Sequence, residues 1–455
     1  MRAHCTMWIG LLAVLTVSAD LFAQRRGRFR RDGAPPPAAE PKEEAKAEDA
    51  DKKPERHLAI VGGDVYLGTG QRITGATVLC GDDKILAVGH DLELPDGTEI
   101  VDAKGRTVCP GFVCVMGGGM GEGSGSPFVD SVNPFAPQIK QGLAAGITAF
   151  LANSPRGGST PAGDTAVIKL AWGDVEGMVL REGSVLGMSA QLKPTDRHTF
   201  DELVEKAKAH QKALAEFRSK PADGKEKEPK APPGTDTILQ VLDGKARLWL
   251  QLGGSFRNPF GGGGGSSSDL DSIRDALDLA RELGTGVVLV KPTSAWLCPA
   301  EIAATDSMAI LCPRERSPAD PADPDHTGSN LASAALLDAA GIPLAVTCPT
   351  GFFGGAGVGL GGILGQDLNT PTVDAAYAVR GGLDNRRALR TLTLDAARIL
   401  GVDDRIGSLE AGKDADILIL DGDPLHYRTF VTVAIVNGKI AYEKSKEPFY
   451  SHIQR

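Results

Sequence analysis

The segment from Val108 to Gly118 has the shape of a strand that holds a metal ion, but with the metal ligands missing. Its sequence, VCPGFVCVMGG, leads out of a short β segment into an apolar run that predicts a buried strand. The run ends on Cys114, Met116 and Gly118. A thioether is a poor ligand for zinc, and glycine has no ligand atom. The first question for this chain is therefore whether it is an enzyme.

The same segment resembles the first barrel strand of the amidohydrolase superfamily. In that superfamily a Pro-Gly-Phe-aliphatic-Asp-x-His-x-His run closes the strand, and its two histidines hold the catalytic metal. Residues 110–113 match the first half of the run, whereas the Asp falls on Cys114 and the histidines fall on Met116 and Gly118. The resemblance therefore implies a family metal site that has lost its ligands.

A second resemblance to this superfamily lies near the end of the sequence. Residues 405–416 read RIGSLEAGKDAD and match the G-S-L-x-x-G-K-x-A-D signature. Residues 393–401 resemble the T-x-x-x-A-x-x-L-G helix that precedes it, with Asp395 where Asn is usual. Residues 146–170 resemble the exported imidazolonepropionase-like branch, so that the resemblance covers about residues 58–442.

The predicted fold is α/β: a distorted (β/α)8 barrel of the TIM type with a small composite β-sandwich built from both ends of the chain. Apolar strand-like runs alternate with helical ones, as in parallel barrels. Strands are expected at 113–116, 147–152, 166–171, 248–252, 287–291, 309–312 and 343–348, and helices at 137–145, 200–218, 269–283, 330–340 and 384–389. The expected divisions are a signal peptide (1–23), a disordered linker (24–57), the sandwich (58–112 and 401–445) and the barrel (113–400).

Composition and the N-terminus bound the location and the partners. The apolar core from Met7 to Val17 is too short to span a bilayer comfortably, and small residues after it offer cleavage behind Ala19 or Ala23. We therefore expect an exported protein, periplasmic or extracellular, with no membrane contact beyond its signal; an uncleaved anchor is the alternative. A net charge of −9 argues against nucleic acid as the main partner. Six of the seven cysteines follow the signal, mostly in apolar runs, which favours small buried side chains over a disulfide framework.

The other ligand positions of the family also carry unsuitable side chains. By resemblance, the ligands that end the fifth, sixth and eighth barrel strands fall on Gln251, Lys291 and Cys348. Lys291 would place a positive charge beside a cation, unless its amine is neutral or carboxylated. The histidines are His4, His57, His90, His198, His210, His326, His426 and His452. No two of them have a metal-ligand spacing, although His198 and His326 could reach the barrel mouth.

The strand ends carry glycine where side chains would be expected. Runs at 117–125, 261–265 and 351–362 could line a backbone pocket for an anion or an extended polymer, or could mark relaxed selection at an abandoned site. Lys291 could be a nucleophile with a lowered pKa, or a paired or surface lysine.

Sulfur-bearing residues offer a further alternative at the same end of the barrel. Cys114, Met116, Met120 and Cys348 could form a soft-metal site, because the first and eighth strands adjoin in a closed barrel. The interpretation that we favour is that they pack the barrel floor as apolar side chains.

The sequence favours a pseudoenzyme with a binding or scaffold role. Its family chemistry would be the metal-dependent hydrolysis of cyclic or non-peptide C–N amide bonds, with zinc or another divalent metal, but we expect no catalytic residue and no cofactor here. The alternative is a working C–N hydrolase with a divergent site that uses Asp164, Cys348 or His326. The sequence leaves open whether the ligand is a small molecule or a protein, the oligomeric state, and whether a paralogous subunit supplies an active site.

Overall fold

A computed structural model describes residues 56–123, 125, 127–219, 227–252, 269–349, 358, 368–448 and 450–453. The predicted signal peptide and the linker up to residue 55 lie outside the described residues, as do the glycine run 261–265 and, apart from Val358, the run 351–362. Within the described ranges, no helix combines the length and the apolar character that a bilayer span requires.

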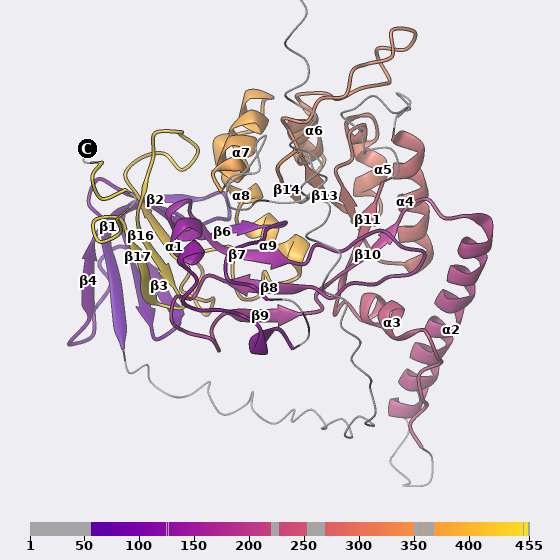
Figure 1. Ribbon diagram of the computed structural model, residues 1–455, viewed down its shortest axis with the longest axis horizontal. Helices are drawn as coiled ribbons and strands as arrows, with labels where there is room; N and C mark the ends of the chain where they lie inside the picture. The colour runs from indigo at the N-terminus through magenta and orange to yellow at the C-terminus, as the bar shows by residue number, and fades with distance from the viewer. Residues whose placement is uncertain are drawn as a thin grey trace, which may run out of the picture. The chain divides into compact units, whose positions relative to one another are not determined.

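Both ends of the chain contribute to one eight-stranded sheet, at the left of Figure 1. Its strands are β1 (His57–Tyr66), β2 (Arg72–Gly81), β3 (Lys84–Gly89), β4 (Glu99–Asp102), β5 (Thr107–Pro110), β15 (Ile417–Leu420), β16 (Val431–Val436) and β17 (Lys439–Glu443). The two ends join where β5 pairs antiparallel with β15, from Ile417 opposite Pro110 to Leu420 opposite Thr107. His57, expected in the linker, is the first residue of β1.

This composite sheet has its own apolar core, filled from both ends of the chain. The core includes Ile60, Val78, Val108, Ile417 and Ile435. Its residues come from the N-terminal strands and from β15 and β16 alike, so neither end contains the whole core. The predicted composite unit is therefore present as a sheet, whereas the second layer of a sandwich is not seen among the described residues.

The middle of the chain forms two further sheets. The four-stranded sheet contains β6 (Phe112–Cys114), β7 (Ile147–Ala152), β8 (Ala166–Lys169) and β9 (Val179–Glu182). The five-stranded sheet contains β10 (Val185–Ser189), β11 (Arg247–Gln251), β12 (Val288–Val290), β13 (Met308–Leu311) and β14 (Leu344–Val346), all parallel. Parallel strands buried on both faces explain why their sequences are apolar throughout rather than alternating.

A closed ring of eight parallel strands is not seen in the described residues. β8 runs antiparallel to β7 and β9, and no hydrogen-bonded ladder joins β14 to β6. The cause lies in residues 153–165, which form no helix between β7 and β8, so that the chain returns antiparallel instead of crossing over. The two sheets nevertheless share one core, which includes Met116, Val167, Trp249, Ile310, Ala345 and Ile399.

Nine α-helices are described: α1 (Pro137–Ala144), α2 (Pro194–Ser219), α3 (Asp236–Leu242), α4 (Leu270–Leu283), α5 (Pro299–Ala303), α6 (Ser333–Ala339), α7 (Thr370–Arg380), α8 (Asn385–Thr391) and α9 (Leu394–Leu400). The sequence of α4 illustrates why these segments form helices. Its buried Ile273, Leu277 and Ala280 recur every three or four residues, which gives one apolar face. Gly284 ends the helix at φ 74°, a conformation that glycine adopts without strain.

Candidate functional site

The predicted ligand positions lie at one end of the strands. Gln251 is the last residue of β11, Lys291 follows β12 directly, and Cys348 lies two residues beyond β14. Met116 lies two residues beyond β6. Parallel α/β folds bind ligands at the carboxyl ends of their strands, so these positions form the candidate site.

Met116 and its neighbours make a buried, sulfur-rich contact between β6 and β14. The Met116 side chain is 3% exposed, and the hydroxyl of Thr347 lies 3.7 Å from its sulfur. The thiol of Cys114 donates to the main-chain oxygen of Met116 at 2.8 Å, and Cys348 is fully buried beside Thr347. Burial raises the pKa of Cys114 to about 12 and also raises the pKa of Cys348. Both therefore stay protonated thiols that pack as small apolar side chains.

Glu122 is a carboxylate beside Gly118 that the sequence analysis missed. A Cβ atom at Gly118 would lie 3.1 Å from Oε1 of Glu122. That carboxylate accepts hydrogen bonds from the main-chain N–H groups of Gly119 and Met120, the second at 2.7 Å. The sequence did carry a signal, because Glu122 is the only charged side chain in the glycine run 117–125.

Gln251 is not directed at the sulfur-rich contact. Its side-chain amide donates to the carbonyl oxygen of Pro155 at 3.2 Å, in the loop that joins β7 to β8. Its side chain also lies 3.4 Å from where a Cβ atom at Gly157 would stand. The amide therefore fastens β11 to this loop.

Lys291 is held in a strained backbone conformation at the end of β12. Its φ angle is 53°, in the left-handed region that a long side chain rarely adopts. Its side chain is 12% exposed, and its ammonium lies 3.5 Å from Oε2 of Glu315. Its charge opposes the burial that raises the pKa values of Cys312 and Cys348. Such strain persists where surrounding structure enforces it, and this is common at functional sites.

A buried ion pair joins the loop after β13 to α7. Arg314, two residues after Cys312, donates to both carboxylate oxygens of Asp374 on α7, at 3.0 and 3.1 Å. The Asp374 side chain is fully buried. Burial raises its pKa, whereas the Arg314 charge acts in the opposite direction. Sixty residues separate the partners, so no local pattern could have predicted the pair.

The three residues of the alternative hydrolase do not come together. Asp164 is exposed in the loop between β7 and β8, and Cys348 is buried. The His326 side chain is 71% exposed and pairs with Asp323 at 2.7 Å, a contact that raises the pKa of the imidazole. His198, the other candidate for the barrel mouth, lies on α2 with its side chain 78% exposed.

The donors at the strand ends do not fit the metal that the family resemblance implies. Within the described ranges, no three His, Cys, Asp or Glu side chains are grouped so that they could hold a metal ion. The expected positions instead offer a thioether at Met116, no side chain at Gly118 and an ammonium at Lys291. A catalytic zinc takes about three nitrogen, sulfur or carboxylate ligands. No catalytic step through a metal is therefore derived for this site.

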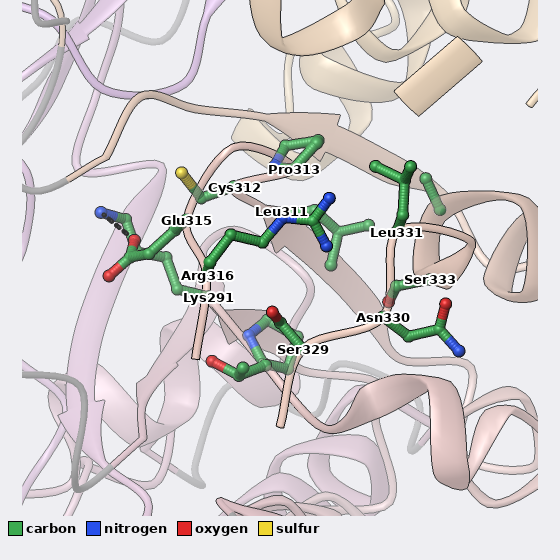
Figure 2. Close-up of a pocket in the computed structure, with 13 residues that line it drawn as sticks. Lys291, Leu311, Cys312, Pro313, Glu315, Arg316, Ser329, Asn330, Leu331 and Ser333 are labelled. Atoms are coloured by element: carbon green, nitrogen blue, oxygen red, sulfur yellow. Dashed lines mark ion pairs between the residues drawn. The ribbon is translucent and has the colours of Figure 1, made fainter. Parts of the chain in front are cut away.

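A small pocket lies next to Lys291, between the loops that follow β12 and β13 and residues 329–334 (Figure 2). Its volume is about 40 Å³. A larger cleft of about 520 Å³ borders the composite sheet and contains Lys169, Arg405 and Lys439, whose charges are already paired with aspartates. The pocket beside Lys291 is the better candidate for binding, since it lies at the strand ends.

Comparisons with known proteins agree with the resemblance in the sequence. Residues 333–446 match the model of the amidohydrolase family. A 5-methylthioadenosine/S-adenosylhomocysteine deaminase from Symbiobacterium thermophilum is 32% identical over 105 residues, which are 20% of this chain and 22% of the relative. The match thus spans about a fifth of that relative's length.

Solved structures extend the comparison to the fold. An amidohydrolase from Thermotoga maritima MSB8 has a TM-score of 0.60 and 24% identity, over 85% of this chain and all of that one. An adenosine deaminase from Xanthomonas campestris with bound zinc has a TM-score of 0.47 and 16% identity, over 84% of this chain and 92% of that one. The first likeness establishes a shared fold; the second is too distant to support an argument.

Proposed function

We propose, from the premise that this chain belongs to the amidohydrolase superfamily, that it is a pseudoenzyme: it binds a ligand at its strand ends and does not hydrolyse C–N bonds with a metal. Its relatives by name include deaminases and hydrolases. We thus place the binding site at the strand ends, where the resemblance puts the metal site, and expect ligand binding there in place of hydrolysis.

The observation that carries this proposal is the position of Lys291. An ammonium held at the end of β12, only 12% exposed, repels a divalent cation at the place where the resemblance puts a ligand. Its partner Glu315 lies on the loop after β13, with Oε2 3.5 Å from the amine. Met116 and Cys348, buried and uncharged, supply no anionic donor in compensation.

The proposal extends to features for which only the sequence speaks. We propose that the chain belongs to the imidazolonepropionase-like branch, that residues 1–23 are a signal peptide and that the mature protein is exported. The apolar core from Met7 to Val17 and the small residues before Ala19 and Ala23 support this. Sequencing the N-terminus of protein recovered from the cell envelope tests this proposal. Protein that still begins at Met1 would contradict a cleaved signal peptide.

The test of the main proposal is metal content together with activity. Protein purified without chelator is expected to carry well under one zinc, manganese, iron or nickel per chain, measured by elemental analysis. After incubation with each metal it is expected to hydrolyse no cyclic amide, imidazolone or dipeptide above the buffer rate. One tightly bound metal per chain, with activity that a chelator abolishes, would overturn the proposal in favour of a hydrolase with a divergent site.

A further inference from the structure

The pocket beside Lys291 contains a guanidinium that is not used by the fold. Arg316 lies on the loop after β13 and is exposed, and within the described part of the chain it has no hydrogen bond and no ion pair. Figure 2 shows its side chain extending across the pocket, with the guanidinium directed toward Leu331. The neighbouring Arg314 is different, because its guanidinium already donates to both carboxylate oxygens of Asp374. Arg316 is thus a cation available to a ligand.

The opposite wall carries polar groups that are also left over. The hydroxyl of Ser333 is buried and has no hydrogen-bond partner within the described structure. Asn330 uses its side-chain oxygen to accept from the main-chain N–H of Ala332 at 2.9 Å, which turns its amide nitrogen into the remaining donor. A buried hydroxyl without a partner costs free energy unless a ligand or water satisfies it.

The rest of the pocket is apolar and small. Leu311, Pro313, Leu331 and Ala334 line it between the polar groups. The pocket's volume of about 40 Å³ is a few times the roughly 10 to 15 Å³ that a site for one water molecule needs. Only the head of a ligand fits inside, and its remaining atoms must extend outward along the apolar lining.

We propose that this pocket binds the carboxylate group of a small organic acid with a short apolar body. The planar guanidinium of Arg316 matches the two oxygens of a carboxylate in a bidentate geometry. The Ser333 hydroxyl and the Asn330 amide are further donors from the facing wall. This inference rests on the proposed function in one respect: it names the ligand class for the same strand-end site.

A carboxylate suits this pocket better than a phosphate does. Glu315 lies on the same loop as Arg316 and holds the Lys291 ammonium at 3.5 Å, so that one of the two nearby cations is already neutralised. A dianionic phosphate would meet the Glu315 carboxylate with only Arg316 unpaired, which is unfavourable. A monoanion balances the single free charge.

Ligand-observed NMR with the full chain tests the proposal. Sodium propionate is the probe, propionamide is the neutral control of the same shape, and inorganic phosphate is the competing anion. Saturation transfer is expected to propionate and not to propionamide, and an equal concentration of phosphate is expected to leave the signal unchanged. Signal for propionamide alone, or loss of propionate signal on adding phosphate, would overturn the carboxylate assignment.

Variants locate the binding on the residues named. Arg316→Ala is expected to weaken propionate binding at least tenfold, Arg316→Lys less, because a lysine keeps the charge and loses the fork, and Ser333→Ala a few-fold. Arg281→Ala, which removes an exposed arginine of α4 that pairs with Asp278, is the matched control and should bind like the parent. Binding by Arg316→Ala equal to the parent would place the ligand elsewhere.

The outcome separates this inference from the proposed function. Propionate binding in a protein that also proves to be a metal-dependent hydrolase would keep the ligand class and remove the pseudoenzyme. If the protein has neither metal nor activity and does not bind propionate, the pseudoenzyme proposal stands and the carboxylate ligand class is wrong. Arg316 is exposed, so the Arg316 variants are expected to fold, and their unfolding transitions check it.

Discussion

Nζ of Lys169 on β8 lies 3.0 Å from Oδ2 of Asp414, and this fully buried pair fastens the four-stranded sheet to the loop before β15. Lys169 also lies 2.9 Å from Asp416, and Arg405 binds Asp414 from a second side at 2.8 Å. Asp414 belongs to the signature at residues 405–416, so the most specific match in the sequence includes a residue that stabilises the fold. Removing one partner of such a pair leaves a buried charge without compensation, at a cost of about 3 to 5 kcal/mol.

Acid should weaken the ion pair between Lys169 and Asp414 in a defined range of pH. Burial alone would raise the pKa of Asp414, but Lys169, Arg405 and Lys84 hold it at about 2, below the ordinary 3.8. A lowered carboxyl pKa contributes stability that is present above pH 3.8 and is lost as the pH falls toward 2. The contribution is about 2 kcal/mol. Urea unfolding of the parent at pH 7 and pH 3 is expected to show the loss of about half of this contribution.

Asp414→Asn isolates the contribution of this carboxyl from the rest of the chain. The variant is expected to be less stable than the parent at pH 7, and the gap should narrow by pH 3. Asp278→Asn, which removes an exposed carboxylate from α4, is the control and should track the parent at both pH values. A gap of constant size between pH 7 and pH 3 would show that Asp414 does not titrate in this range.

The backbone at Lys291 gives a second prediction. A residue with a Cβ atom at φ 53° carries a strain of about 1 kcal/mol that glycine does not. Lys291→Gly and Lys291→Ala both lose the contact with Glu315, so the difference between them reports the backbone alone. The glycine variant should be the more stable by about 1 kcal/mol in urea unfolding. Equal stabilities would mean that the strain is absent in solution.

Local apolar runs were sufficient to predict most of the elements. The strand at 147–152 and the helices near 137–145 and 269–283 are present within a residue or two of the predicted bounds. Their spacing of apolar residues is a local pattern that the sequence shows directly. The pairing of the two ends was expected from the resemblance of residues 405–416, and in the structure β5 and β15 form one antiparallel ladder.

What the sequence could not predict depends on contacts between distant residues. The reversed direction of β8 follows from a missing helix rather than from the strand itself, whose apolar run reads the same either way. The sequence around Lys169 gives no local reason for a lysine inside an apolar strand. A buried lysine needs a carboxylate partner, but the sequence does not show which carboxylate that is. Its partner Asp414 is 245 positions away, and Arg314 finds Asp374 across 60.

The composite sheet should fail as a whole when its C-terminal strands are removed. Deleting residues 403–455 would expose the edge of β5 and the apolar core that Ile417 and Ile435 complete. The truncated chain is expected in the insoluble fraction after expression. A chain ending at Glu447 keeps the 2.9 Å contact between Glu447 and Lys140 of α1 and should stay soluble. A soluble, cooperatively unfolding chain of residues 1–402 would contradict the shared core.

Placing histidine and aspartate at the ligand positions that the resemblance implies tests where the metal site of the family would stand. Met116→His, Gly118→His and Cys348→Asp together are expected to raise bound zinc from well under one per chain toward one, measured by elemental analysis after dialysis. Gly118 can accept a side chain, because its nearest neighbour is the flexible carboxylate of Glu122 at 3.1 Å. That carboxylate would then stand beside the new histidine as a further donor.

Lys291 sets the strength of that restored site. Adding Lys291→Met to the triple variant removes the ammonium and should raise zinc occupancy further, because a positive charge no longer opposes the ion. The same substitution in the parent supplies no nitrogen or carboxylate ligand and should leave zinc unchanged, which makes it the control. A folded triple variant with no more zinc than the parent would mean that Met116, Gly118 and Cys348 are not the positions from which the ligands were lost.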